Sequence, residues 1–275
     1  MKLITLTTDF GLRDWFVGTM KGVILSINPR ATIVDLTHEI APGDIRGGAF
    51  ALAAGYRFFP KGTVHVAVVD PGVGSERRAF AVQTADYTFI GPDNGVLSFA
   101  LARETILSVR AIRNPTLFRM PVSQTFQGRD IFAPVAAFLS RNGSLGKVGP
   151  RVKNFIRLAW PSPRLLHRAL RGEVVCVDRF GNAITNISAA RVRSMRSAVL
   201  FVRNKRVCRL AEFYQAVPPG KPLALIGSSG LLEVAINGGS AADALGLKVG
   251  TPVTLHPDKR LSRMRDGARG AAKQS

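Results

Sequence analysis

The sequence predicts an α/β protein with an N-terminal doubly wound, mostly parallel sheet and a smaller C-terminal β-barrel domain. In the first half, short β-branched runs alternate with segments of helical apolar periodicity, as in βαβ units. After Pro150 the helical patterns give way to short strands and frequent turn residues, which favours a small barrel or sandwich. We therefore expect domains at residues 1–155 and 170–257, followed by a basic, disordered tail at 258–275.

The elements of the first half are predicted in order from this periodicity. Strands are expected at 3–8, 32–36 and 63–69, and helices at 15–26 and 45–56. The run at 63–69 is almost continuously apolar, which is typical of a strand buried on both faces of a parallel sheet. A hairpin at 80–84 and 87–90 should precede helices at 96–102 and 131–140, with Asp130 as the N-cap of the last.

The second half contains fewer and weaker signals. Pro161, Pro163 and the basic run to Arg171 indicate a linker. Strands are expected at 173–177, 198–202, 223–226 and 231–235.

Charge is distributed unevenly along the chain, whose formal net charge is +20. Residues 1–130 carry 14 basic and 11 acidic side chains, whereas residues 131–275 carry 24 and 7. A nucleic-acid surface is one interpretation of such a half. The basic residues are scattered singly, however, and no aromatic-interleaved RNA motif is present. A solvated basic face is the favoured interpretation, and nucleic acid is not expected as a partner.

Several features bear on location. No apolar run is long enough to span a bilayer, and the N-terminus resembles a first strand rather than a signal peptide. The two cysteines, Cys176 and Cys208, lie 32 residues apart without metal-ligand spacing, which favours two buried thiols over a disulfide. A cytoplasmic protein without membrane contact is predicted.

Acidic residues follow two of the predicted strands. Asp9 comes after the first strand, and Asp70, followed by a Pro-Gly turn, comes after the apolar strand at 63–69. Ligands of open α/β sheets gather at the carboxyl ends of strands, so both carboxylates are candidates for a site. The alternative is that each caps its own turn through Asx hydrogen bonds.

Other polar turns are further candidates. Asp178 and Asn182 put a carboxylate and an amide on one turn, which suits the hydroxyls of a ribose. A second polar cluster is formed by Ser228, Ser229 and Glu233, where a plain hairpin is the alternative. The turn at 91–95 is expected to be structural. Of the four histidines, His65 is expected in the core, and His38 is placed at a strand end, where it can orient a loop.

Familiar catalytic motifs are absent from the sequence. There is no P-loop, no GxGxxG after the first strand and no GxSxG elbow. The histidines show no metal-ligand spacing, so neither a metal nor a cofactor is expected.

These motifs together resemble one family, the S-adenosyl-L-methionine (SAM) hydroxide adenosyltransferases, or SAM hydrolases, which are relatives of the fluorinase and chlorinase. The resemblance extends from about residue 3 to 255. It is carried by Thr8–Gly11, Asp35–His38, Val68–Gly74, Gly91–Gly95, Gly128–Pro134, Asp178–Asn182, Ser228–Gly230 and Asn237–Ala242.

The resemblance implies a homotrimer whose sites lie where one subunit's N-terminal domain meets the C-terminal domain of the next. It implies that water attacks C5′ of SAM in line with the sulfonium and gives adenosine and L-methionine. By position, Asp9 matches the family's ribose ligand, and Asp178 and Asn182 match the residues that hold ribose and the amino-acid part of SAM. Ser228 and Ser229 match the contacts of the methionine end, the backbone around Ile236 and Gly238 matches that of adenine, and Glu233 lies beside them.

The resemblance also implies which residues activate water. Asp70 and Arg77 match two of the three residues with that role. Members of the family usually have His at the third position, which is Gln127 here. Glutamine orients water but accepts no proton at neutral pH, so a working but weaker hydrolase is expected.

Two alternatives follow from the same residues. A non-catalytic SAM or adenosine binder would share the ligand residues and lack turnover because of Gln127. A halogenase is disfavoured, because the halogenases replace the Asp70-type acid with an uncharged residue and carry an insertion that this chain lacks.

Overall fold

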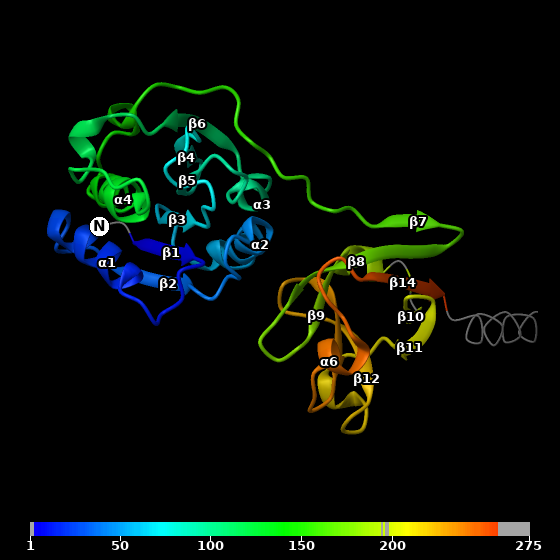
Figure 1. Cartoon of the computed structure of the whole chain (residues 1–275). Helices are drawn as coiled ribbons and strands as arrows, with labels where there is room; N and C mark the ends of the chain where they lie inside the picture. The colour runs from blue at the N-terminus through cyan, green and yellow to red at the C-terminus, as the bar shows by residue number, and fades with distance from the viewer. Residues whose placement is uncertain (1–2, 194, 196–197, 258–275) are drawn as a thin grey trace, which may run out of the picture. The chain divides into compact units, whose positions relative to one another are not determined.

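The computed structural model describes residues 3–193, 195 and 198–257 of the chain. The chain divides into two compact units, Met1–Ala159 and Trp160–Ser275 (Figure 1). The tail predicted at 258–275 lies outside the described residues. No helix in the described part of the chain is long and apolar enough to cross a membrane.

A six-stranded sheet forms the centre of the first unit, with strand order β2-β1-β3-β5-β4-β6. β2, β1, β3 and β5 run parallel, and β4 pairs antiparallel with both β5 and β6. The mostly parallel sheet and the hairpin are therefore confirmed, whereas β6 was not predicted. The strands are β1 Ile4–Thr8, β2 Ile33–Thr37, β3 Val64–Val68, β4 Ala79–Thr84, β5 Thr88–Pro92 and β6 Ile106–Ala111.

Helices cover both faces of this sheet (Figure 1). Ile4 and Leu6 of β1 pack with Met20 of α1 and Phe132 beside α4 in one buried core. Successive side chains of a strand point to opposite faces, so Thr5 lies on the α2 side. The helical segments are α1 Phe16–Ile27, α2 Ile45–Gly55, η1 Tyr56–Phe58, α3 Ser98–Leu101, η2 Pro115–Leu117, η3 Gly128–Phe132, α4 Ala133–Ser140 and η4 Leu145–Val148.

His65 lies in the core of the α2 face, as the sequence predicts. Its Nδ1 lies 2.7 Å from the hydroxyl of Thr5, and its ring packs against Tyr56 and Phe89 at centroid distances of 5.8 and 5.2 Å. Burial lowers the pKa of His65 to about 3. The folded protein therefore holds this histidine neutral among aromatic rings.

The segment before α4 differs from the sequence-based prediction. Asp130 is not a helix N-cap: it lies inside η3, a π-helical turn, and α4 begins after Phe132 without a side-chain cap. The buried Asp130 carboxylate accepts hydrogen bonds from Arg129 and from the backbone N–H of Ser123. Burial alone would raise the pKa of Asp130, but these hydrogen bonds outweigh it and lower the pKa. Asp130 thus ties the loop at 119–125 to the π turn.

The second unit is a nearly closed barrel. Strand order along the sheet is β11-β10-β14-β8-β9-β13-β12, with β7 paired to β8. The N–H of Ala211, just after β11, donates to Ala224 of β12 at 2.7 Å, which brings the two outer strands together. The strands of the second unit are β7 Arg164–Leu166, β8 Ala169–Val177, β9 Ala183–Ser188, β10 Ala198–Val202, β11 Lys205–Arg209, β12 Pro222–Ile226, β13 Leu231–Ile236 and β14 Pro252–Pro257.

The prediction of a linker before Arg171 is wrong in part, because β7 and the start of β8 form a hairpin there. His167 and Arg168 turn the chain with φ values of 44° and 67°. Two consecutive positive φ values are typical of a type I′ turn, usually signalled by Asn-Gly. The pair here carries no such signal. The short helices of this unit are α5 Ala189–Arg193, η5 Tyr214–Ala216 and α6 Ala241–Leu245.

Neither Cys176 nor Cys208 forms a disulfide in the described part of the chain, as predicted. Cys208 is buried in the barrel core, where burial raises the pKa of its thiol to about 12. Cys176 is only half-buried, so the expectation of two buried thiols holds for one of them.

The buried neutral His65 predicts an acid-dependent loss of stability. The unfolded chain protonates this ring near its ordinary pKa of 6.5, whereas the folded protein resists protonation down to about pH 3. The free energy of unfolding should therefore have its full value above pH 6.5 and fall by up to about 1.4 kcal/mol per pH unit below it. His65→Gln should flatten that fall in urea titrations between pH 6.5 and 4, and the exposed-site control His167→Asn should not. An unchanged slope in His65→Gln would contradict this account.

Candidate active site

Two predicted site carboxylates follow neighbouring parallel strands. Asp9 follows β1 and Asp70 lies two residues beyond β3, and the register pairs Thr8 with Val68. Both therefore lie at the carboxyl edge of the sheet, where open α/β sheets bind ligands. The Asp9 carboxylate accepts a hydrogen bond of 2.8 Å from the backbone N–H of Gly43, in the loop between β2 and α2.

Arg77 connects the other two predicted water-activating residues, Asp70 and Gln127, by hydrogen bonds. Its Nε lies 2.9 Å from each carboxylate oxygen of Asp70, and its Nη2 donates to Asp70 Oδ2 and, at 2.5 Å, to Oε1 of Gln127. Only 5% of the Asp70 side chain and 11% of the Arg77 side chain are exposed. The three residues that the sequence singles out thus form one buried, charge-assisted cluster, and low exposure strengthens such bonds.

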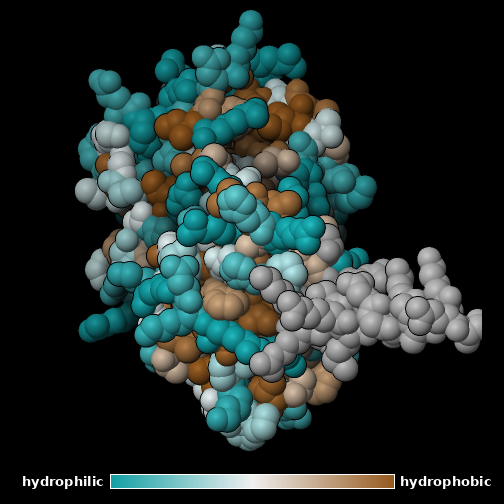
Figure 2. Space-filling model, turned by 90° about the vertical axis from the view of Figure 1, so that its right-hand side faces the viewer, coloured by the Kyte–Doolittle hydropathy of each residue, from teal (hydrophilic) through white to brown (hydrophobic). Residues whose placement is uncertain are grey.

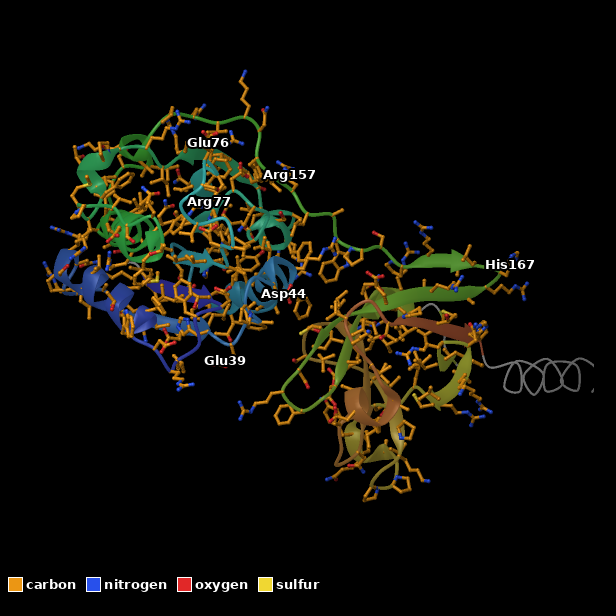
Figure 3. The ribbon with its side chains drawn as sticks, viewed as in Figure 1. Glu39, Asp44, Glu76, Arg77, Arg157 and His167 are labelled. Carbon is orange, nitrogen blue, oxygen red and sulfur yellow. The ribbon has the colours of Figure 1, made fainter. Side chains whose placement is uncertain are left out.

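The loop that carries Arg77 requires glycine at one position. Gly74 has φ of +81°, and a Cβ there would lie 2.3 Å from the backbone oxygen of Gln124. This close approach seats the loop against the segment that leads to Gln127. On the other side of the cluster, the Arg77 guanidinium carbon lies 5.6 Å from the centre of the Phe132 ring, where a cation–π contact is favourable. Arg77 is labelled in Figure 3.

His38 orients the loop after β1, as the sequence predicts. Its side chain is buried, with Nδ1 2.8 Å from the Thr8 hydroxyl and Nε2 3.1 Å from Oδ1 of Asp35. Its backbone oxygen accepts from Gly11 N–H at 2.8 Å. Burial alone would raise the pKa of Asp35, but its hydrogen bonds with Lys21 and His38 lower it. These contacts fix the strand end from which Asp9 projects.

The turn at 91–95 is structural, as expected. Asp93 is buried, accepts from Arg78 at 2.7 Å and from the backbone N–H of Ile156 at 2.7 Å, and so ties the end of the first unit to the sheet. Asn94 donates to the backbone oxygen of Val69 at 2.7 Å, which steadies the strand end before Asp70.

In the second unit, Asp178 caps its own turn. Its Oδ1 accepts from the backbone N–H groups of Phe180 and Asn182 at 2.9 and 2.8 Å, and its Oδ2 accepts from the Asn182 amide at 3.1 Å. These bonds form an Asx turn, and the same bonds orient Asn182. Gly181 has φ of +79°, and a Cβ there would lie 2.1 Å from the Ser240 hydroxyl.

A pocket of about 560 Å³ opens beside this turn. Three predicted ligand residues, Asn182, Ile236 and Gly238, line it. Sequence reasoning did not assign a role to the remaining lining residues. They are Phe180, Tyr214, Gly239 and Ser240.

Phe180 and Tyr214 are aromatic residues in polar segments of the sequence, and that pattern is the signal that could have marked them as ligand contacts. Phe180 is 77% exposed and Tyr214 is 42% exposed. Exposed aromatic residues beside a pocket are typical of a ligand site, because they offer a flat apolar surface.

Glu233 lies behind the pocket rather than in its lining. Its Oε1 accepts from the Tyr214 hydroxyl at 2.6 Å, and a Cβ on Gly227 would lie 2.2 Å from its Oε2. Burial raises the pKa of Glu233, and the charge of Asp178 raises it further, whereas the hydrogen bond from Tyr214 acts to lower it. The same bond raises the pKa of Tyr214 to about 12. Glu233 therefore holds Tyr214 at the pocket wall.

Ser228 and Ser229 lie on the turn between β12 and β13, outside the residues that line the pocket. Ser228 is exposed, and the buried hydroxyl of Ser229 has no hydrogen-bond partner among the described residues. A buried hydroxyl without a partner is costly, so a ligand atom would be a favourable neighbour for it.

The described residues contain no group of three or more His, Cys, Asp or Glu side chains that could hold a metal ion. Asp70 is engaged by Arg77, and His38 by Thr8 and Asp35. Independence from a metal or cofactor stays a prediction.

Known proteins are similar to this chain in sequence and in three-dimensional structure. Relatives named (R)-S-adenosyl-L-methionine hydrolase include one from Salinispora arenicola, 39% identical over 90% of this chain and 95% of its own length. Another, from Thermus thermophilus, is 40% identical over 93% of this chain and 100% of its own length. A solved structure, an uncharacterized conserved protein from Thermotoga maritima, is 37% identical with a TM-score of 0.88, covering 92% of this chain and 99% of its own.

Two domain profiles match the chain as well. The SAM hydroxide adenosyltransferase N-terminal domain matches residues 4–149, which include Asp9, Asp70, Arg77 and Gln127. The C-terminal domain of the same family matches residues 172–254, which include the pocket beside Asn182. The chain therefore belongs to the SAM hydroxide adenosyltransferase family.

Proposed function

We propose that this protein hydrolyses SAM to adenosine and L-methionine. The water oxygen forms a bond to C5′, the C5′–sulfur bond breaks, and its electron pair leaves with the sulfur as the neutral thioether of methionine. The proton released by water passes to a base and then to solvent. The observation that carries the proposal is the buried Arg77 cluster, which joins Asp70 and Gln127 in a chain about 40% identical to relatives named SAM hydrolase.

Asp70 is the base in this proposal. The sulfonium is a good leaving group, so the enzyme needs only to orient water and remove its proton in a site of low dielectric constant. The Gln127 oxygen is engaged by Arg77 at 2.5 Å, which leaves its amide N–H groups to donate to water. Gln127 therefore positions the water and Arg77 polarises it, while proton removal is left to Asp70.

Substrate binding in this proposal uses residues of both units. Asp9 binds ribose, and Asp178 and Asn182 hold ribose and the amino-acid part. Ser228 and Ser229 receive the methionine end, with Glu233 beside them, and the backbone at Ile236 and Gly238 receives adenine. The pocket beside Asn182 supports this assignment, since its volume of about 560 Å³ suits a nucleoside-sized ligand.

The proposal extends to assembly and location. We infer a cytoplasmic homotrimer in which the N-terminal unit of one subunit and the C-terminal unit of the next complete each site. Neither metal nor cofactor takes part, because sulfonium departure needs no Lewis acid. A non-catalytic SAM binder is the alternative, and chromatography of a SAM incubation separates the two, because only the enzyme releases adenosine.

Loss of the base should abolish turnover. Asp70→Asn keeps the size of the side chain but removes its basicity, so adenosine formation should fall by about 10²–10⁴-fold. The matched control Asp86→Asn changes a surface carboxylate of the same unit and should retain full activity. Adenosine release is followed by chromatography. Activity of Asp70→Asn within twofold of the natural protein would rule out Asp70 as the base.

A histidine at position 127 should accelerate the reaction. Gln127→His supplies a second group able to accept a proton near neutral pH, so kcat should rise on the order of 10-fold. Steady-state rates of adenosine release by both proteins, measured with SAM in excess of KM, give the comparison. If the natural protein leaves SAM intact over long incubation and Gln127→His does not restore cleavage, the hydrolase assignment fails.

Mixed assemblies should recover activity that each parent lacks. Asp70→Asn disables the N-terminal half-site and Asn182→Ala disables the C-terminal one. In a trimer whose sites are shared between subunits, random co-assembly leaves about one site in four with two intact halves. Co-expressed variants purified as one species of about 89 kDa, three times the 29.6 kDa chain, should show that fraction of activity. No recovery in a verified mixed trimer would place each site within one chain.

A further inference from the structure

Five neighbouring strands of the second unit align arginines across one face. The sheet runs β7-β8-β14-β10-β11, and the strand register pairs Arg164 with Arg171, Arg171 with Thr254, Thr254 with Phe201 and Phe201 with Arg206. These five residues form a row across the strands, here called the basic row, and a register shift between Leu200 and Phe201 in the β10–β11 pair brings Arg206 opposite Phe201. Three of its five members are arginines.

The basic row faces away from the barrel core. Leu170, Leu200 and Leu255, each next to a member of the row along its strand, are buried in that core. Neighbouring side chains of a strand point to opposite faces, so the row lies outside. The exposure of the residues agrees: all three arginines of the row are exposed, and Phe201 is half-buried.

An aromatic pair lies beside the middle of the basic row. The rings of Phe201 and His256 have centroids 4.8 Å apart with an interplanar angle of 66°. Val199, two residues before Phe201 on β10, pairs with His256 on one side and with Arg209 on the other. The face thus places rings between arginines on both flanks.

Acidic side chains hardly offset this charge. The five strands carry Arg164, Arg171, Lys205, Arg206 and Arg209 against the single acid Glu173. The sequence that follows β14 adds six basic and two acidic residues at 258–275. Figure 2 shows hydrophilic and hydrophobic residues interspersed in the view that it presents.

We propose that the basic row, with His256, binds single-stranded nucleic acid. Arginines would contact successive phosphates, and the Phe201–His256 pair would stack a base, the combination that single-strand-binding barrels use. In the sequence these residues are scattered between positions 164 and 256, which argued against a nucleic-acid surface. The strand register gathers them. This activity is independent of the proposed SAM hydrolysis, since the row shares no residue with the candidate active site.

The test is fluorescence anisotropy of a labelled oligouridylate of about 12 residues with the full chain. Three phosphate contacts predict a log–log salt slope of about −2, at roughly 0.7 per neutralised phosphate. The combined variant Arg164→Ser, Arg171→Ser, Arg206→Ser should bind at least about 10-fold more weakly and lose most of that slope. Phe201→Leu, which keeps an apolar side chain, should weaken binding by about fivefold or more through lost stacking.

A charge-matched control separates a site from a general charge effect. The set Arg13→Ser, Arg30→Ser, Arg113→Ser removes three exposed arginines from the first unit. It should leave the affinity within about twofold, and unchanged thermal unfolding should show that all variants are folded. Equal weakening by both sets overturns the proposal, as does failure of the natural protein to bind the oligomer. Binding to phosphatidylserine vesicles without binding to the oligomer also overturns it.

Discussion

The Arg77 guanidinium contacts two loops at once, Asp70 at the carboxyl end of β3 and Gln127 before the π-helical turn. Both loops are placed by the sheet beneath them: Asn94 holds the end of β3, and Asp130 ties the loop at 119–125 to the π turn. Because the cluster is almost fully buried, its charge-assisted bonds act in a medium of low dielectric constant. The geometry on which water activation depends is therefore built by the fold before any ligand arrives.

The two units divide the chemical work. The first supplies a carboxylate, a guanidinium and an amide in contact with one another, the groups to which we assign the orientation and deprotonation of water. The second supplies a pocket in which Asn182 is fixed by Asp178, and Tyr214 by Glu233. The carboxylates of the second unit thus position Asn182 and Tyr214. Gln127 lies in the first unit, outside the residues that line this pocket.

Sequence reasoning found most of the first unit, because buried parallel strands such as β3 and helices such as α1 have strong periodicity. It missed β6, β9, β11 and β14, whose polar and apolar residues alternate too briefly, and the I′ turn at His167, which lacks an Asn-Gly signal. Asp130 was misassigned because a π turn has no sequence signature distinct from that of an α-helix start. For the site, Asp70 was a candidate from its position at a strand end, Arg77 and Gln127 came from the family resemblance, and only coordinates could put Tyr214 beside Asn182.

The most direct test of the central claim is to follow the oxygen atom of water. SAM is incubated with the natural protein in oxygen-18-labelled water, and both products are analysed by mass spectrometry. The account predicts labelled adenosine, with the label at O5′, and unlabelled L-methionine. Label in the amino-acid product, or cleavage that yields methylthioadenosine in place of adenosine, would contradict water attack at C5′.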